Sequence, residues 1–315
     1  MSESRRQGLL PYAAFVGLGL IWGVSFLFFK LGVRDMSPTV LVFIRSASGV
    51  IALALIMRAS GRSLFAGKLR ERIGHFAFMG LMNAVIPWVA IAWGEQTISS
   101  GLASILNATS PFWTAVFIYW VIPAERPSVL NYAGVLIGIA GVVLLVLPDI
   151  TSRGLSGSVL GALAVVGASM AYSVAAIYQR VRMRGMDVFQ QSLGQLIAST
   201  IIVFPFAVPT LPHIHLAFVS MGAVIALGAI GSGVAYLLYY YTMNTLGPVR
   251  AVGVTFIVPI TAVFWGVVLL GESLNLAIVA GMLVILAGIV LTNIRKRRTP
   301  QPQLALDTEK EEAAV

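Results

Sequence analysis

The sequence predicts an all-helical integral membrane protein, and two observations lead to this class. Of the 315 residues, 58% are hydrophobic and only 10% are charged, and the mean hydropathy is +0.91. A water-soluble domain carries about 25% charged residues, so this chain cannot cover itself with hydrated side chains. Apolar segments of about 20 residues, long enough to cross a bilayer, also recur along nearly the whole chain.

Ten such segments follow one another, and each is expected to be a transmembrane helix. A segment inside hydrocarbon must satisfy its own backbone hydrogen bonds, which favours helices, and these runs lack the alternation of barrel strands. The first segment is taken as a span and not as a cleaved signal, because it ends in bulky residues. The predicted spans are 10–29, 38–57, 74–94, 100–122, 129–148, 157–179, 190–209, 216–240, 248–270 and 275–294.

Lysine and arginine positions predict the orientation of these spans. With a cytoplasmic N-terminus, 17 of the 21 basic residues fall in cytoplasmic segments, while Lys30, Arg34 and Arg153 fall outside and Arg45 lies within a span. Basic residues favour the cytoplasmic side. Both termini, residues 1–9 and a polar, disordered tail at 296–315, are therefore expected to be cytoplasmic in a multi-pass membrane protein.

Composition also excludes several kinds of site. The chain has no cysteine, so disulfides and thiolate metal sites are excluded. Its net charge of +9 does not indicate nucleic-acid binding, because the basic residues flank the apolar segments. No G-x-x-x-x-G-K-[ST] run is present, so ATP is not the direct energy source. His213 and His215 lack a nearby carboxylate ligand and are read as loop residues; no metal and no cofactor are expected.

The stretch "SPFWTAVFIYWVIPAERPSV" at 110–129 is nearly repeated as "VPITAVFWGVVLLGESLN" at 258–275. Equivalent residues lie 147 to 150 positions apart, in order, across five segments. The chain is therefore expected to consist of two five-helix repeats, 10–148 and 149–295. Five is an odd number, so the repeats should be inverted relative to each other around a central cavity, as in many secondary transporters. The equivalent pairs include Trp22 with Tyr172, Arg45 with Gln195, Pro111 with Pro259, Glu125 with Glu272, and Gly134 with Gly281.

The tandem five-helix units, "LIWGVSFLFFK" followed by "SPTVLVFIR", and the two tails of proline, glutamate and glycines resemble the drug/metabolite transporter (DMT) superfamily, in its ten-helix EamA-type form. The resemblance covers about residues 10–295 and implies export or exchange of small metabolites, often amino acids. Within the superfamily the chain looks most like the YddG-type bacterial amino-acid exporter branch, which implies a place in the bacterial inner membrane. The small multidrug pumps of the superfamily are expected to carry an acid in the first helix, and 10–29 has none, which disfavours cationic drugs.

Glu125 and Glu272 each precede the last helix of their half. A carboxylate there favours the positive end of the helix dipole, so both are interpreted as structural residues. Arg45 is the clear ionisable residue within a span, and intramembrane charges are functional candidates. Its guanidinium can bind a substrate carboxylate through two hydrogen bonds. A structural arginine, bonded to carbonyls or reaching outward, is the alternative.

Polar and aromatic side chains at helical spacing suggest which helix faces line the cavity. The aromatic residues could stack on a substrate or hold an ammonium group. Helix packing and the aromatic belt at the membrane interface are the structural alternatives. The candidate substrate-binding residues are Trp22, Arg45, Asn83, Trp88, Asn107, Tyr172, Gln195, Tyr236 and Tyr240. The candidate hinge or packing residues are Pro111, Pro259, Gly134 and Gly281.

These observations favour a secondary transporter that exports or exchanges small amphipathic metabolites, with neutral or aromatic amino acids first. Nucleosides, sugars and lipophilic compounds are the alternatives within the superfamily. A membrane enzyme is disfavoured because paired acids, a serine with a base, and a metal cluster are missing from the spans. A receptor or scaffold would not need polar stripes in both halves. The expected partners are a small-molecule substrate and the lipid bilayer, and the expected state is a monomer, with a weak homodimer as the alternative.

Overall fold

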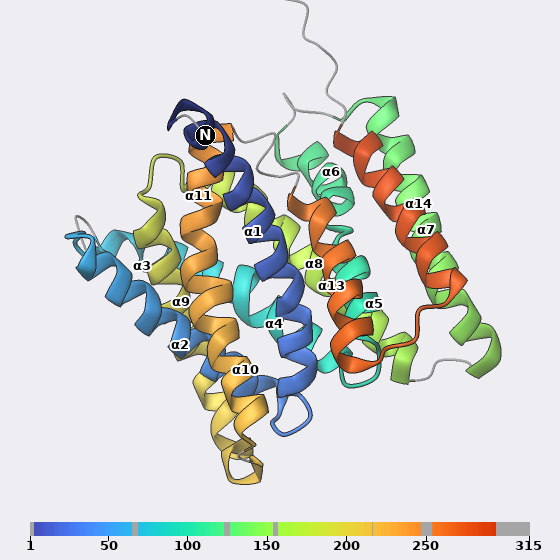
Figure 1. Cartoon of the computed structure of the whole chain (residues 1–315), viewed down its shortest axis with the longest axis horizontal. Helices are drawn as coiled ribbons and strands as arrows, with labels where there is room; N and C mark the ends of the chain where they lie inside the picture. Colours follow the sequence, from blue (N-terminus) through green and yellow to red (C-terminus); the bar gives the residue numbers. More distant parts are fainter. Residues whose placement is uncertain are drawn as a thin grey trace, which may run out of the picture.

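The computed structural model describes residues 3–64, 69–122, 127–153, 157–215, 217–246 and 254–293, and in these ranges every regular element is a helix (Figure 1). The elements are α1 (Glu3–Gly32), α2 (Pro38–Ala59), α3 (Leu69–Gly80), η1 (Leu81–Val85), α4 (Ile86–Gly94), α5 (Ser100–Asn107), α6 (Ser110–Val121), α7 (Val129–Arg153), α8 (Gly157–Arg182), α9 (Val188–Ala207), η3 (Val208–His213), α10 (Phe218–Gly228), η4 (Ala229–Val234), α11 (Ala235–Leu246), α13 (Val254–Leu270) and α14 (Leu276–Asn293).

Eight helical runs in the described residues are long and apolar enough to cross a bilayer, and α13 and α14 are two shorter apolar helices. Together they correspond to the ten predicted spans, so the all-helical membrane class is confirmed. The boundaries differ at several ends: α1 begins near the N-terminus and α7 continues to Arg153. The predicted start of the ninth span, at 248, lies outside the described residues, which resume with Val254.

Three of the predicted spans are not continuous α-helices. The third is α3, the π-helical turn η1 and α4, and the eighth is α10, the π-helical turn η4 and α11. The fourth breaks between α5 and α6, just before Pro111. Proline lacks a backbone N–H and tolerates only the first turn of a helix, so the chain begins a new helix there. Apolar periodicity alone does not reveal such insertions.

Helices α2 and α9, which are equivalent in the two halves, run antiparallel, as three contacts along their length show. The start of α2 is joined to the end of α9 by Ser37 Oγ and Thr210 Oγ1, 2.7 Å apart. The opposite ends are joined by Arg62, after α2, and Asp187, which caps α9, with a 3.4 Å ion pair. Between them Ser46 and Ser199 share a buried 2.8 Å hydrogen bond. Helices α2 and α9 therefore lie side by side in opposite directions.

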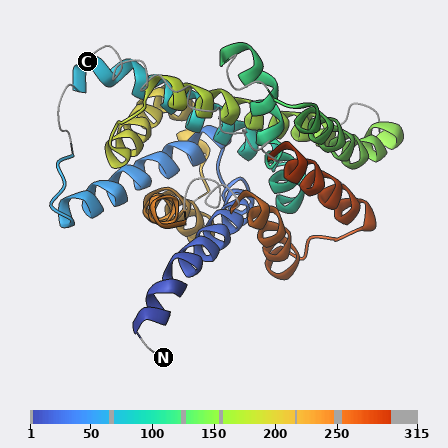
Figure 2. The same ribbon diagram turned by 90° about the horizontal axis from the view of Figure 1, so that it is seen from above.

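Helices α7 and α14 form a pair at one side of the molecule, in green and red in Figures 1 and 2. Small residues bring their backbones together: a β-carbon on Gly134 would lie 2.6 Å from the Gly288 carbonyl oxygen. One on Gly281 would collide with the Leu145 side chain. Glycine permits such close helix approaches. The predicted glycine faces of these two helices therefore pack against each other.

The sequence predicts that Glu272 stabilises the last helix of its own half. This prediction is wrong, because Glu272 caps a helix of the first half. The two carboxylate oxygens accept hydrogen bonds from Ser100 N at 2.7 Å and Gly101 N at 3.2 Å, at the start of α5. A left-handed Gly271, with φ of 65°, turns the chain back. The start of α14 is capped instead by Asn275, whose side chain accepts from Ile278 N. Glu125 lies outside the described residues.

Candidate substrate cavity

A cavity of about 370 Å³ lies between the two halves of the chain. Helices α1, α2, α4, α5 and α6 contribute to its wall from the first half, and α8, α9, α11 and α13 from the second, together with both π-helical turns. The predicted binding residues that line it are Trp22, Arg45, Asn83, Trp88, Asn107, Tyr172, Gln195 and Tyr236. The side chain of the ninth, Tyr240, lies outside the described residues, and its neighbour Tyr239 lines the cavity.

Arg45 is the single charged side chain among the described residues that line the cavity. The residue is only 7% exposed, and its guanidinium carbon lies 3.6 Å from the ring centre of Trp88 and 4.9 Å from that of Phe29. These are cation–π distances. The Nε group of Arg45 is buried and has no hydrogen-bond partner within the described part of the chain. The cavity thus contains a cation held by aromatic faces, without a carboxylate beside it.

The position of Arg45 follows from close helix packing behind it. A β-carbon on Gly228 of α10 would collide with the carbonyl oxygen of Arg45 and with Ser48 Oγ. Glycine at this crossing lets α2 and α10 approach with their backbones in contact. The side chain of Arg45 therefore projects from a helix that is fixed on one face, and its aromatic neighbours fix the guanidinium group on the other.

An amide and hydroxyl chain crosses from one half to the other. Asn83 Nδ2 donates to Gln195 Oε1 at 3.1 Å, and Gln195 Nε2 donates to the Tyr236 hydroxyl at 2.7 Å. The Gln195 amide is thereby fixed in orientation, because its acceptor oxygen and its donor nitrogen have different partners. Asn83, from the first half, is held at the cavity wall by Gln195 of the second half, which is held in turn by Tyr236.

Both π-helical turns lie at the cavity. Asn83 belongs to Leu81–Val85, and Gly231 and Ser232 belong to Ala229–Val234. A π-turn inserts a residue into the helix and changes its hydrogen bonds, and such turns are frequent at functional sites. Here the indole Nε1 of Trp22 donates to the Gly231 carbonyl at 3.3 Å. Ser232 Oγ is buried without a hydrogen-bond partner among the described residues.

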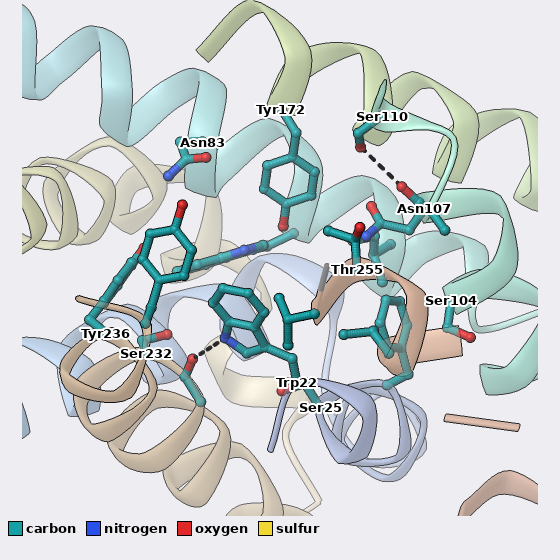
Figure 3. A pocket seen from close by; sticks show the side chains of 18 of the residues that line it. Trp22, Ser25, Asn83, Ser104, Asn107, Ser110, Tyr172, Ser232, Tyr236 and Thr255 are labelled. Carbon is teal, nitrogen blue, oxygen red and sulfur yellow. Dashed lines mark hydrogen bonds between the residues drawn. The ribbon is translucent and has the colours of Figure 1, made fainter. Parts of the chain in front are cut away.

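The cavity has two polar ends with aromatic rings between them (Figure 3). Asn83 and Tyr236 lie at one end, Asn107 and Ser110 at the other, and Trp22 and Tyr172 between them. Asn107 is the last residue of α5, so its position depends on the break before α6. Its Oδ1 atom is buried and accepts no hydrogen bond from the described residues. This end therefore offers an acceptor for a donor group on a ligand.

Other lining residues were not on the predicted list. Phe29, Tyr239 and Thr255 line the wall, as do Gln179 and Ser192. Phe29 and Gln179 are equivalent in the repeat, and Tyr239 follows Tyr236 at a helical spacing of three. Repeat equivalence and helical spacing could therefore have predicted that these three residues line the cavity. Thr255 follows residues 247–253, outside the described ranges, and no pattern singled it out.

Two other polar residues, on the helices that carry Asn107 and Gln195 or follow them, have structural partners and do not line the cavity. Ser199 bonds Ser46 between α9 and α2, and Thr114 Oγ1 donates to the Ser110 carbonyl in its own helix. Pro111 lines the cavity at the start of α6, and Pro259 is buried within α13. The hinge role of these two prolines stays a prediction.

His213 ends the 3₁₀ turn η3, and the backbone N–H of His215 donates to the Asp35 carbonyl at 2.9 Å. Among the residues that the structure describes, no three side chains of the metal-binding types gather into a possible site.

Comparisons with known proteins identify the family. The profile of the EamA-like transporter family matches residues 9–147 and again 159–294. The chain is 25% identical to the inner membrane transporter YedA of Escherichia coli (strain K12) over 307 residues, covering 94% of this chain and 95% of YedA. It is 22% identical to the transporter YoaV of Bacillus subtilis (strain 168), over 88% of this chain and 94% of YoaV.

A plant protein and a solved structure are also similar to the chain. The chain is 26% identical to the chloroplastic WAT1-related protein At3g02690 of Arabidopsis thaliana, covering 92% of this chain and 73% of that protein. A crystal structure of a protein with 19% identity has a TM-score of 0.64, covering 92% of this chain and 99% of the other, which shows a common fold. The chain belongs to the EamA-like transporter family, within the drug/metabolite transporter superfamily.

Proposed function

We propose that the protein is a secondary transporter that exports or exchanges small amphipathic metabolites bearing a carboxylate, first among them neutral and aromatic amino acids. The observation that carries this proposal is Arg45, a buried cation at the wall of the cavity between the halves. A buried charge without a counter-charge is costly, so an arriving carboxylate gains both the ion pair and hydrogen bonds to the guanidinium group.

The remaining walls fit the rest of such a substrate. Trp22 and Tyr239, with ring centres 5.7 Å apart, and Tyr172 offer flat apolar surfaces for a side chain. The same rings and the free acceptor on Asn107 can receive an ammonium group. Assignment to the amino-acid exporter branch rests on these features and stays a prediction.

Transport would proceed by alternating access, in which the two halves rock around the cavity. The antiparallel α2 and α9, and the equivalent π-turns in the two halves, support an inverted repeat. The orientation that we propose, with both termini in the cytoplasm of a bacterium, rests on the lysine and arginine distribution. In this arrangement the ends of α1 and α4 face the outside.

Counterflow into proteoliposomes tests the proposal with a matched set of probes. Phenylalanine, 3-phenylpropionate and phenethylamine share one ring and differ in the carboxylate and the amine. Exchange of the two carboxylates, with none of phenethylamine, is the expected result, and the ratio of the two shows whether the ammonium group is bound. A nucleoside, a sugar and a lipophilic cation complete the panel. Exchange of these compounds without either carboxylate would overturn the proposal.

A further inference from the structure

Glu95 is a fully buried acidic residue of the described structure. It follows the last residue of α4 and has no exposed surface, and neither carboxyl oxygen has a hydrogen-bond partner among the described residues. Burying an ionised carboxylate without partners is very costly, and such a group takes up a proton instead. Glu95 is not part of the cavity wall, but Ile91, one turn earlier on α4, is.

The charged neighbours of Glu95 do not satisfy it. Lys30, on α1, donates its ammonium hydrogens to main-chain carbonyls, those of Glu95 itself and, at 2.8 Å, of Ile98. Glu272, which follows α13, uses its carboxylate on the backbone N–H groups of Ser100 and Gly101. Helix α8 packs on α4 through its first turns, and its residues 157–169 carry no charge. Lys30 and Glu272 are thus the charged groups that face Glu95.

Lys30 and Glu272 shift the pKa of Glu95 in opposite directions, so burial decides the protonation state of this carboxyl group. Burial raises the pKa of Glu95, one residue beyond the span that ends at Gly94, well above its ordinary value. Lys30 lowers this pKa and Glu272 raises it, both to a smaller extent than burial. The carboxyl group is therefore protonated in this structure over a wider pH range than an exposed glutamate.

The surroundings of Glu95 join the two halves of the chain. Lys30, Glu95, Ile98 and Ser100 belong to the first half and Glu272 to the second; we call this group the distal seam, since it lies at the end of the bundle where α1 ends. The hydrogen bonds from Ser100 and Gly101 to Glu272 cross between the halves. If the halves part at this end, these bonds break and water reaches Glu95.

We propose that Glu95 is a proton-binding site of the transporter, which holds a proton while the distal seam is closed and releases it to entering water when the seam opens. This proposal rests on the alternating access proposed above. The direction of the pH dependence follows from linkage. The closed form has the higher proton affinity, so low pH favours the closed form. That advantage is lost as the pH rises through the raised pKa, so alkaline conditions favour opening.

Distance measurements across the seam test this site. The native chain has no cysteine, so spin labels at Gln96→Cys and Leu274→Cys, two exposed positions on opposite halves, report on the seam alone. In the full chain in lipid nanodiscs, we expect the population with a longer distance to grow as the pH is raised from about 5 to about 9. With Glu95→Gln, which resembles the protonated acid, the short distance should dominate at every pH.

A control and a second variant make the result specific to Glu95. Glu71→Gln makes the same change at an exposed acid at the other end of the third span and should leave the pH response intact. Glu95→Leu serves as a second variant should Glu95→Gln fold poorly, with the same expectation. A Glu95→Gln protein that keeps the full pH response, or an unaltered Glu95 protein with no response, overturns the proposal. Counterflow by the same labelled protein separates the two proposals, because transport without a pH response defeats only the proton site.

Discussion

The two halves of the chain share backbone features, namely π-helical turns and helix caps, but have different side chains at the cavity. Both have a π-helical turn in their third helix, Leu81–Val85 and Ala229–Val234. Both begin their last helix with a polar cap, Ser128 with Asn131 in the first half and Asn275 in the second. The cavity side chains diverge: Arg45 stands where the repeat has Gln195. The repeat therefore builds a symmetric frame around an asymmetric binding surface.

This difference separates what the fold requires from what recognition requires. Backbone devices recur because each half must bend its helices at equivalent places. A symmetric pair of arginines would leave two buried charges to compensate, whereas one arginine and one glutamine give a cavity with one charged side. The difference between the halves thus gives the cavity its polarity.

The largest expected effect comes from removing that polarity. Arg45→Gln makes the first half match the second at this position, and we expect a loss of about 2–3 kcal/mol in binding of a carboxylate, or about 30- to 150-fold in affinity, because hydrogen bonds to charged groups are the stronger ones. Counterflow and equilibrium binding measure the loss. The double variant Arg45→Gln, Gln195→Arg moves the charge to the other half. Recovery of carboxylate binding in this variant would show that the presence of the charge matters more than the half that carries it. Unchanged transport by Arg45→Gln would assign Arg45 a structural role.

A smaller effect is expected where the last helices of the two halves meet. Gly134→Ala forces α7 away from the Gly288 carbonyl and should lower the free energy of unfolding by about 1–3 kcal/mol. Gly167→Ala on α8 is the matched control, because its β-carbon meets nothing within 4 Å. That change should be neutral or stabilising by up to about 1 kcal/mol. Unfolding of both variants in the same detergent measures the difference, and equal stability would contradict the contact.

The hydrogen bond of Tyr236 with Gln195 is a weaker link between α11 and α9. Tyr236→Phe removes the hydroxyl that accepts from Gln195 Nε2, and should weaken substrate binding by about 1 kcal/mol, or about five-fold, because the Gln195 amide loses its fixed orientation. Tyr241→Phe, at the exposed side of the same helix, is the control and should have no effect. A similar loss from both variants would indicate a general effect of losing a hydroxyl on α11.

A change of similar size is expected at the cap that joins the halves. Glu272→Gln keeps the shape of the side chain but removes the negative charge at the start of α5 and one of the two oxygens that accept hydrogen bonds from Ser100 N and Gly101 N, which should cost about 1 kcal/mol. Thermal unfolding measures this loss, with Glu71→Gln as an exposed control. An equal stability of the Glu272→Gln protein and the unaltered protein would contradict the cap.

The sequence was sufficient for the spans and for eight of the residues that line the cavity. Hydrophobic length predicts the helices because hydrocarbon imposes it, and polar residues at helical spacing predict faces such as that of Asn107 and Gln195. The partner of Glu272 was mispredicted, since a left-handed glycine turns the loop toward a helix from the other half. The π-turns, and the carboxyl of Glu95 that lacks a partner among the described residues, depend on three-dimensional packing, which leaves no periodic signal in the chain.

Alternating access of the cavity is the central claim, and cysteine accessibility tests it most directly. Single cysteines at positions 107 and 195, in a chain that has none, would be treated with an impermeant thiol reagent in right-side-out and in inside-out vesicles. The account predicts that each position is labelled from both sides of the membrane, and that a transported carboxylate slows the labelling. Labelling of both positions from one side only, unchanged by any carboxylate, would contradict it.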